Sequence, residues 1–130
     1  MSTPKSSLAK NLGSQPSFVL LCRQCRNVLT DQLVETNDNA FKGFKNPLVA
    51  IGRVYADSNE YVVHPDNSIG TRISDDPATS SGCCGEDGAN GPNTCCQRCG
   101  SLLATEISDC VTELATRFVR SKVLLESATT

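Results

Sequence analysis

The cysteines are the residues of this sequence whose type and spacing most clearly allow chemistry. Two C-x-x-C pairs, Cys22 with Cys25 and Cys96 with Cys99, are separated by residues 26–95. A C-x-x-C turn can present two thiolates to one zinc ion, and two such turns complete a tetrahedron of sulfur ligands at about 2.3 Å. The long insertion is tolerable because loop-closure entropy grows only logarithmically with length. We therefore predict one structural Zn²⁺ ion bound by these four cysteines.

The other four of the eight cysteines leave alternatives open. Cys95 could replace Cys96 as a ligand, although its spacing to the last cysteine of the motif is less usual. Cys83 and Cys84 lie in a Gly-rich stretch and are expected to be exposed, reduced thiols. Cys110 is expected to pack as a small apolar residue on a helix. Disulfides or a different set of ligands are the alternative to the zinc site.

Catalytic signals are weak elsewhere in the sequence. A zinc ion with four protein ligands keeps no open position for water, so hydrolytic metal catalysis is disfavoured. His64 is the only histidine and precedes a proline, and we expect it to be a solvated surface residue. Tyr55 and Tyr61 are expected to pack on a sheet. Because no P-loop, dinucleotide fingerprint or nucleophile–base pair is evident, we predict a protein that is not an enzyme.

Composition limits the class of protein. A chain of 130 residues suits one domain, and the absence of Trp, a single Met and 5% aromatic residues leave a thin core that gains from a bound metal. The net charge of −2 gives no overall attraction to nucleic acid or to an anionic membrane. A local basic cluster of Arg117, Arg120 and Lys122 leaves direct nucleic-acid binding open. The polar N-terminus lacks a signal-peptide core, so we expect an intracellular, reducing location without membrane association.

Turn and strand signals predict a mainly β fold. We expect a disordered tail over residues 1–15 and one zinc domain over residues 16–126, with an exposed polar loop at 74–94. A short amphipathic helix is predicted over residues 108–118, where apolar residues recur at three- and four-residue spacing. The predicted strands lie within residues 18–22, 28–35, 48–55, 61–63, 68–73, 101–107 and 118–125.

The segment from Phe18 to Asp31, FVLLCRQCRNVLTD, resembles the opening of the Mis-eighteen family of centromere proteins, whose domain is also called Yippee-like. In that family an apolar strand enters C-x-x-C, followed by Leu or Val and then Asp. The segment CQRCGSLL at residues 96–103 fits the family's second knuckle, and the similarity spans about residues 16–125. Departures include Gln32, where the family often has Ser, and residues 103–106, where it has Gly-x-x-Tyr.

This resemblance implies two antiparallel sheets joined by a four-cysteine zinc site, an arrangement called a β-tent. It also implies a nuclear, centromeric protein that assembles with itself or a paralogue and helps to recruit the chaperone of the centromeric histone variant. Two alternatives use a similar zinc fold. One is a ligand-binding module like the thalidomide-binding domain of cereblon, although its aromatic cage usually needs Trp. The other is an enzyme like methionine sulfoxide reductase, with Cys84 or Cys110 as nucleophile.

Overall fold

The computed structural model describes residues 15–79 and 85–128. Within these ranges the chain forms β-strands and short 3₁₀-helices, and it contains no α-helix. The predicted tail over residues 1–15 lies outside the described residues except for Gln15, which is exposed. The strands are β1 (Phe18–Cys22), β2 (Val34–Glu35), β3 (Arg53–Ala56), β4 (Glu60–Val63), β5 (Thr71–Ile73), β6 (Thr94–Cys96), β7 (Leu102–Ile107), β8 (Ala115–Val119) and β9 (Val123–Ser127), and the 3₁₀-helices are η1 (Pro65–Asn67), η2 (Pro77–Thr79) and η3 (Arg120–Lys122).

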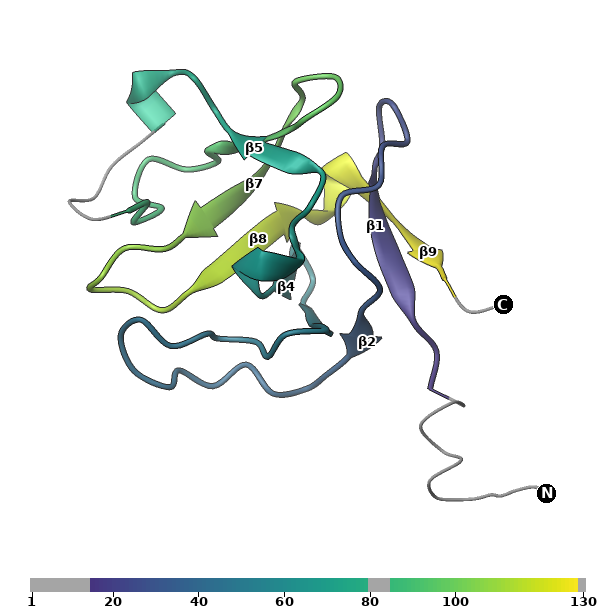
Figure 1. Ribbon diagram of the computed structural model, residues 1–130, viewed down its shortest axis with the longest axis horizontal. Helices are drawn as coiled ribbons and strands as arrows, with labels where there is room; N and C mark the ends of the chain where they lie inside the picture. Colours follow the sequence, from purple (N-terminus) through teal and green to yellow (C-terminus); the bar gives the residue numbers. More distant parts are fainter. Residues whose placement is uncertain (1–14, 80–84, 129–130) are drawn as a thin grey trace.

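The strands form two sheets, as expected for a mainly β protein. β1 pairs with β9 in a two-stranded antiparallel ladder, and the other strands form one sheet in the order β2-β3-β4-β8-β7-β6-β5. Figure 1 shows the β1–β9 ladder at one flank of this larger sheet. The expectation of purely antiparallel sheets is wrong at one edge, because β2 runs parallel to β3. The short 3₁₀-helix η3 carries the chain from β8 in the larger sheet to β9 in the smaller one.

One hydrophobic core joins the two sheets. Leu20 and Cys22 of β1 are fully buried and cluster with residues of the larger sheet. Phe118 of β8 is the largest fully buried side chain among the described residues. Burying a side chain of this class stabilises the fold by about 1.5–3 kcal/mol. The core members are Leu20, Cys22, Leu29, Leu33, Val54, Tyr61, Val63, Cys96, Leu103, Ala104, Phe118 and Val123.

The predicted helix over residues 108–118 is wrong. Residues Ala115–Val119 form β8, which pairs with β4 on one side and β7 on the other. Ala115, Thr116 and Phe118 are buried there. Two neighbouring strands supply the backbone hydrogen bonds of this segment, and such tertiary pairing overrides a local three- and four-residue spacing of apolar residues.

Four further strand predictions and the loop prediction need correction. Only residues 53–55 of the expected 48–55 strand and residues 71–73 of the expected 68–73 strand lie in strands. Only Val34–Glu35 of the expected 28–35 strand is a strand, because the rest crosses between the sheets through isolated bridges such as Leu21–Val28. The expected 118–125 strand divides into the end of β8, η3 and the start of β9. The 74–94 loop is not exposed throughout, since Asn93 and Thr94 are buried. The strand prediction for residues 18–22 is confirmed, because β1 has the same bounds.

Candidate metal centre

The four predicted ligands come together from two different sheets. Cys22 ends β1 of the small sheet and Cys96 ends β6 of the large sheet, and their C-x-x-C partners follow in tight turns. These turns are called the first knuckle (residues 22–25) and the second knuckle (residues 96–99). The Cys22 and Cys99 sulfurs lie 3.6 Å apart, as do the Cys25 and Cys96 sulfurs. All four sulfurs lie within 4.8 Å of one another. Sulfurs around a tetrahedral zinc at about 2.3 Å lie about 3.8 Å apart, so the four thiols are spaced to hold one metal ion.

Both knuckles have the same backbone geometry. The Cys22 N–H donates to Asn27 O at 2.9 Å, and the Arg26 N–H donates to Cys22 O at 2.8 Å. The second knuckle has the same two hydrogen bonds at the same sequence separations. The Cys96 N–H donates to Ser101 O at 2.8 Å, and the Gly100 N–H donates to Cys96 O at 2.9 Å. In each knuckle the residue after the second cysteine has a left-handed backbone conformation, with φ of 66° at Arg26 and 78° at Gly100. A non-glycine residue at such φ is uncommon, and here the knuckle imposes it.

Backbone amides of the turns point at the sulfurs and shift their pKa values. Burial raises the pKa of Cys96, but hydrogen bonds from the N–H groups of Cys99 and Arg98 and from neighbouring thiols outweigh it and lower the pKa to about 7. The Asn27 N–H lowers the pKa of Cys25, whereas burial and the thiols of Cys96 and Cys99 raise it, and the net pKa is above normal. Thiols this close cannot all ionise without a cation between them. The donor set therefore fits a divalent metal.

The knuckles are also joined by direct contacts. Gly70, just before β5, accepts hydrogen bonds from the Gln97 N–H at 2.9 Å and from Asn27 Nδ2 at 3.2 Å. Asn27 Nδ2 also lies 3.6 Å from the Cys96 sulfur. A Cβ atom on Gly70 would lie only 2.0 Å from the Val28 carbonyl oxygen. Asn27 and Gly70 thus hold the two knuckles together, and neither residue was singled out from the sequence.

The remaining cysteines do not join the cluster. Cys95 is buried and free, and because successive side chains of a strand point to opposite faces, it points away from the sulfur of Cys96. It therefore does not replace Cys96. Cys110 is disulfide-bonded and lies in a turn, so its predicted helical packing is wrong. The predictions for Cys83 and Cys84 fall outside the described residues.

His64 has a structural contact that the sequence did not reveal. Its side chain is only 12% exposed, and Nδ1 accepts the Asp66 N–H at 3.0 Å, which caps η1. The prediction of a solvated surface histidine is wrong. Asp31, part of the resemblance motif, accepts a hydrogen bond from Nδ2 of the buried Asn67 at 3.3 Å. Asp31 thus helps to hold the segment after the first knuckle against η1.

The expected sheet packing of the two tyrosines agrees with the structure. Tyr61 is part of the main core, and Tyr55 packs against a second cluster of buried residues.

The three C-terminal cations do not form one free basic patch. Arg117 pairs with Glu60 at 3.1 Å and with Glu113 at 3.7 Å. The Arg120 guanidinium lies 4.7 Å from the centre of the Tyr61 ring in a cation–π contact. Two of the three charges are therefore engaged within the fold.

Comparisons with known proteins give no relative. No protein-family model, curated protein or solved structure matches this chain significantly. In the part of the chain that the structure describes, no helix is long and apolar enough to cross a membrane.

Proposed function

We propose that this protein is a non-enzymatic interaction domain stabilised by one structural zinc ion. The observation that carries this proposal is the four-thiol cluster, in which each close sulfur pair joins one knuckle to the other. A metal there would tie the end of β1 to the end of β6. All four ligands would come from the protein, so the ion would supply cross-linking and no open coordination position. The two sheets bridged at the cluster also support the β-tent assignment.

The free energy of zinc binding favours a structural role for the metal. Structural zinc contributes on the order of 10 kcal/mol or more to the metal-bound state, as much as the whole stability of a typical domain. Among the described residues, the core contains only two aromatic rings, those of Phe118 and Tyr61, and otherwise smaller side chains. Removal of the metal is therefore expected to unfold the domain.

An exposed aromatic pair is the best candidate for the partner surface. Phe41 and Phe44 are 57% and 63% exposed, and their rings meet edge to face with centroids 5.6 Å apart. They account for two of the four phenylalanines of the chain. Paired aromatic side chains left in water gain from burial in a partner, and aromatic residues dominate the energetics of protein interfaces.

The loop that carries this pair is held in one conformation. Asn46 Nδ2 donates to Lys42 O at 3.0 Å and to Phe44 O at 3.3 Å. The Lys45 N–H donates to Thr112 O at 2.8 Å, and Lys45 has a left-handed φ of 66°. A loop fixed in this way loses little entropy on binding. We propose that Phe41 and Phe44 insert into an apolar site of a protein partner.

The centromeric role is proposed from the sequence resemblance of residues 18–31 and 96–103 alone. On that basis the domain assembles with itself or a paralogue in the nucleus and helps to recruit the chaperone of the centromeric histone variant. The reductase alternative predicts turnover of methionine sulfoxide, whereas the interaction domain predicts none. An assay with methionine sulfoxide and dithiothreitol separates the two classes.

The zinc proposal is tested by native mass spectrometry with metal analysis before and after chelation. We expect one zinc per chain and unfolding on chelation. Cys22→Ser and Cys99→Ser should lose zinc and unfold, because each removes one ligand. Cys95→Ser is the control for Cys22→Ser, since Cys95 is also buried but lies outside the cluster, and it should keep one zinc per chain. A Cys22→Ser protein that folds normally without metal would contradict the proposal.

The partner surface is tested separately in the zinc-loaded protein. Phe41→Ser with Phe44→Ser should abolish self-assembly, or binding to a paralogue or chaperone, while the zinc content stays at one per chain. Ile51→Ser is the control, because Ile51 is also 63% exposed but outside the aromatic pair. Assembly that survives the double substitution would remove this surface from the proposal.

A further inference from the structure

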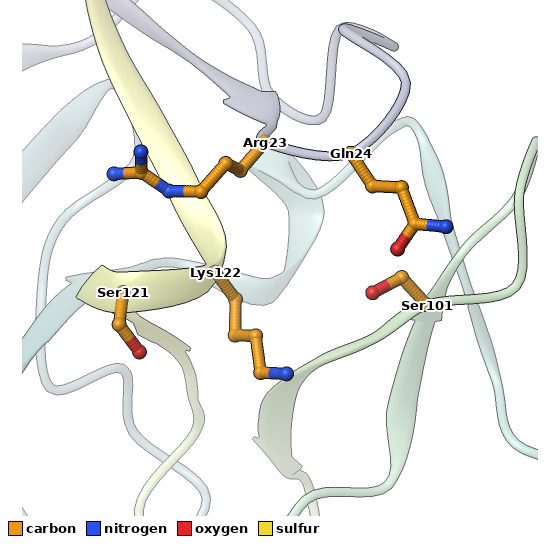
Figure 2. A pocket seen from close by; sticks show the side chains of 5 residues that line it. All are labelled: Arg23, Gln24, Ser101, Ser121 and Lys122. Carbon is orange, nitrogen blue, oxygen red and sulfur yellow. The ribbon is translucent and has the colours of Figure 1, made fainter.

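A polar pocket lies beside the metal centre, where three separate segments meet. Its cavity volume is about 310 Å³. Arg23 and Gln24 come from the first knuckle, Ser101 follows the second knuckle, and Ser121 and Lys122 belong to η3. In Figure 2 Gln24 and Ser101 point toward one another and Lys122 extends to their side of the pocket, whereas the Arg23 guanidinium points away from these three side chains and Ser121 lies on the far side.

The lining of this pocket suits an anion. All five side chains can donate hydrogen bonds, two of them carry a permanent positive charge, and no carboxylate lines the cavity. Sites for uncharged organic ligands are lined mostly by aliphatic and aromatic side chains. Here every lining residue is polar or charged, and the apolar part of the surface comes from carbon atoms of these same residues. Cationic and hydroxyl donors around a small cavity are the groups that bind phosphate in proteins.

The two cations of the pocket have charges that the fold leaves available. Arg26, Lys42, Arg72 and Arg117 each lie within 4 Å of a carboxylate oxygen. Among the described residues, neither of the pocket's cations makes such a pair. The pocket therefore combines two charges that the described part of the fold does not neutralise.

The segments that carry these charges are fixed relative to one another. The Arg23 N–H donates to Lys122 O at 3.1 Å, and Arg23 Nη2 approaches Val123 O at 3.4 Å. These bonds join the first knuckle to η3 and the start of β9. The backbone of the pocket is thus in place before a ligand binds, which lowers the entropic cost of binding.

We infer that this pocket binds a phosphate monoester group. A phosphate dianion matches the two unpaired charges, whereas a single carboxylate would leave one of them uncompensated. Its oxygens can accept from the Lys122 ammonium and from the Ser101 and Gln24 side chains. The Arg23 guanidinium points away from these donors and approaches Val123 O, so Arg23 contributes the attraction of its charge and no direct hydrogen bond. The ligand is either a free phosphate compound or a phosphorylated side chain of a protein. This inference does not depend on a centromeric role.

The competing explanation is charge compensation at the metal centre. Four thiolates with one Zn²⁺ carry a net charge of −2, and Arg23 directly follows Cys22. In that case Arg23 and Lys122 would raise zinc affinity and would have no ligand of their own. Zinc affinity and phosphate binding must therefore be measured in the same variants.

The experiment is an NMR titration of the full zinc-loaded chain at constant ionic strength, with inorganic phosphate in one arm and a short phosphoserine peptide in the other. We expect saturable amide shifts at Gln24, Ser101 and Ser121. Lys122→Gln should weaken binding about tenfold, because a hydrogen bond to a charged group is lost, and Arg23→Gln should weaken it severalfold. The controls are Arg98→Gln, which changes the other knuckle, and Lys45→Gln, which removes an exposed charge elsewhere.

The arms distinguish the source of the phosphate. Tighter binding of the peptide identifies a phosphorylated protein, and equal or tighter binding of inorganic phosphate identifies a free anion. Absence of saturable shifts in both arms overturns the inference. So do shifts that Lys122→Gln leaves unchanged, or pocket variants that lower zinc affinity without altering phosphate binding.

Discussion

Gly70→Ala tests how closely the two knuckles are held together. The new Cβ would lie 2.0 Å from the Val28 carbonyl oxygen and 3.0 Å from the Leu29 Cα, whereas ordinary contacts begin at 3.4 Å. The two backbones must therefore separate by about 1.4 Å, the difference between 3.4 and 2.0 Å. Gly70 cannot move alone, because its carbonyl oxygen accepts the Gln97 N–H and its own N–H donates to Leu29 O at 3.1 Å.

This displacement is large compared with what a metal site tolerates. Metal–ligand distances vary by only about 0.2 Å in well-formed sites. Val28 follows the first knuckle and Gln97 lies inside the second, so the separation opens the gap between the two pairs of thiols. We expect zinc affinity to fall by about 10- to 100-fold, as for other changes around metal ligands, and stability to fall by about 3 kcal/mol from overpacking.

The assay is competition for zinc with a chromophoric chelator, together with thermal unfolding of the loaded protein. Gly91→Ala is the control, since Gly91 also gains a methyl group but has nothing within 4 Å of the new Cβ. Its φ of 80° should cost about 1 kcal/mol through backbone strain, with zinc affinity unchanged. If Gly70→Ala bound zinc as tightly as Gly91→Ala does, the proposed coupling between the knuckles would be refuted.

Three predictions concern polar groups inside the larger sheet. Asn93→Ala should lower the free energy of unfolding by about 2–4 kcal/mol in chemical denaturation, because the buried Asn93 amide bonds to both the N–H and the C=O of Glu106, at 2.8 and 3.0 Å. A decrease in the free energy of unfolding below about 1 kcal/mol would count against this role of Asn93. Thr116→Val should stabilise by about 1 kcal/mol, since the buried Thr116 hydroxyl has no hydrogen-bond partner in the described structure, and a destabilised variant would contradict that account. Burial raises the pKa of Glu106 above its usual 4.5; the hydrogen bond with Ser108 lowers this pKa, and the charge of Glu86 raises it further. Protonated Glu106 therefore contributes stability that is complete below pH 4.5 and is lost as the pH rises through the folded-state pKa. Glu106→Gln should flatten this dependence and raise the melting temperature at pH 7, and an unchanged pH profile would disprove the assignment.

The sequence by itself determined the local features of this protein. A C-x-x-C turn is specified by residues adjacent in the chain, so both pairs of thiols were identified without knowledge of the fold. The apolar run at residues 18–22 predicted β1 with its observed bounds, and the run at residues 101–107 predicted β7 to within one residue. In each case the pattern and the structure depend on the same few neighbouring residues.

Only the tertiary structure decided features that depend on distant partners. Residues 115–119 have the spacing of a helix but form a strand, because β4 and β7 lie on either side of them. Cys95 and Cys96 are adjacent residues of the same type, and because successive side chains of β6 point to opposite faces of the sheet, only Cys96 points into the cluster. Gly70 and the phosphate pocket have no local signal, since each exists only where segments far apart in sequence come within contact distance. Short-range patterns carry no information about such contacts, which is the physical reason that the sequence did not reveal them.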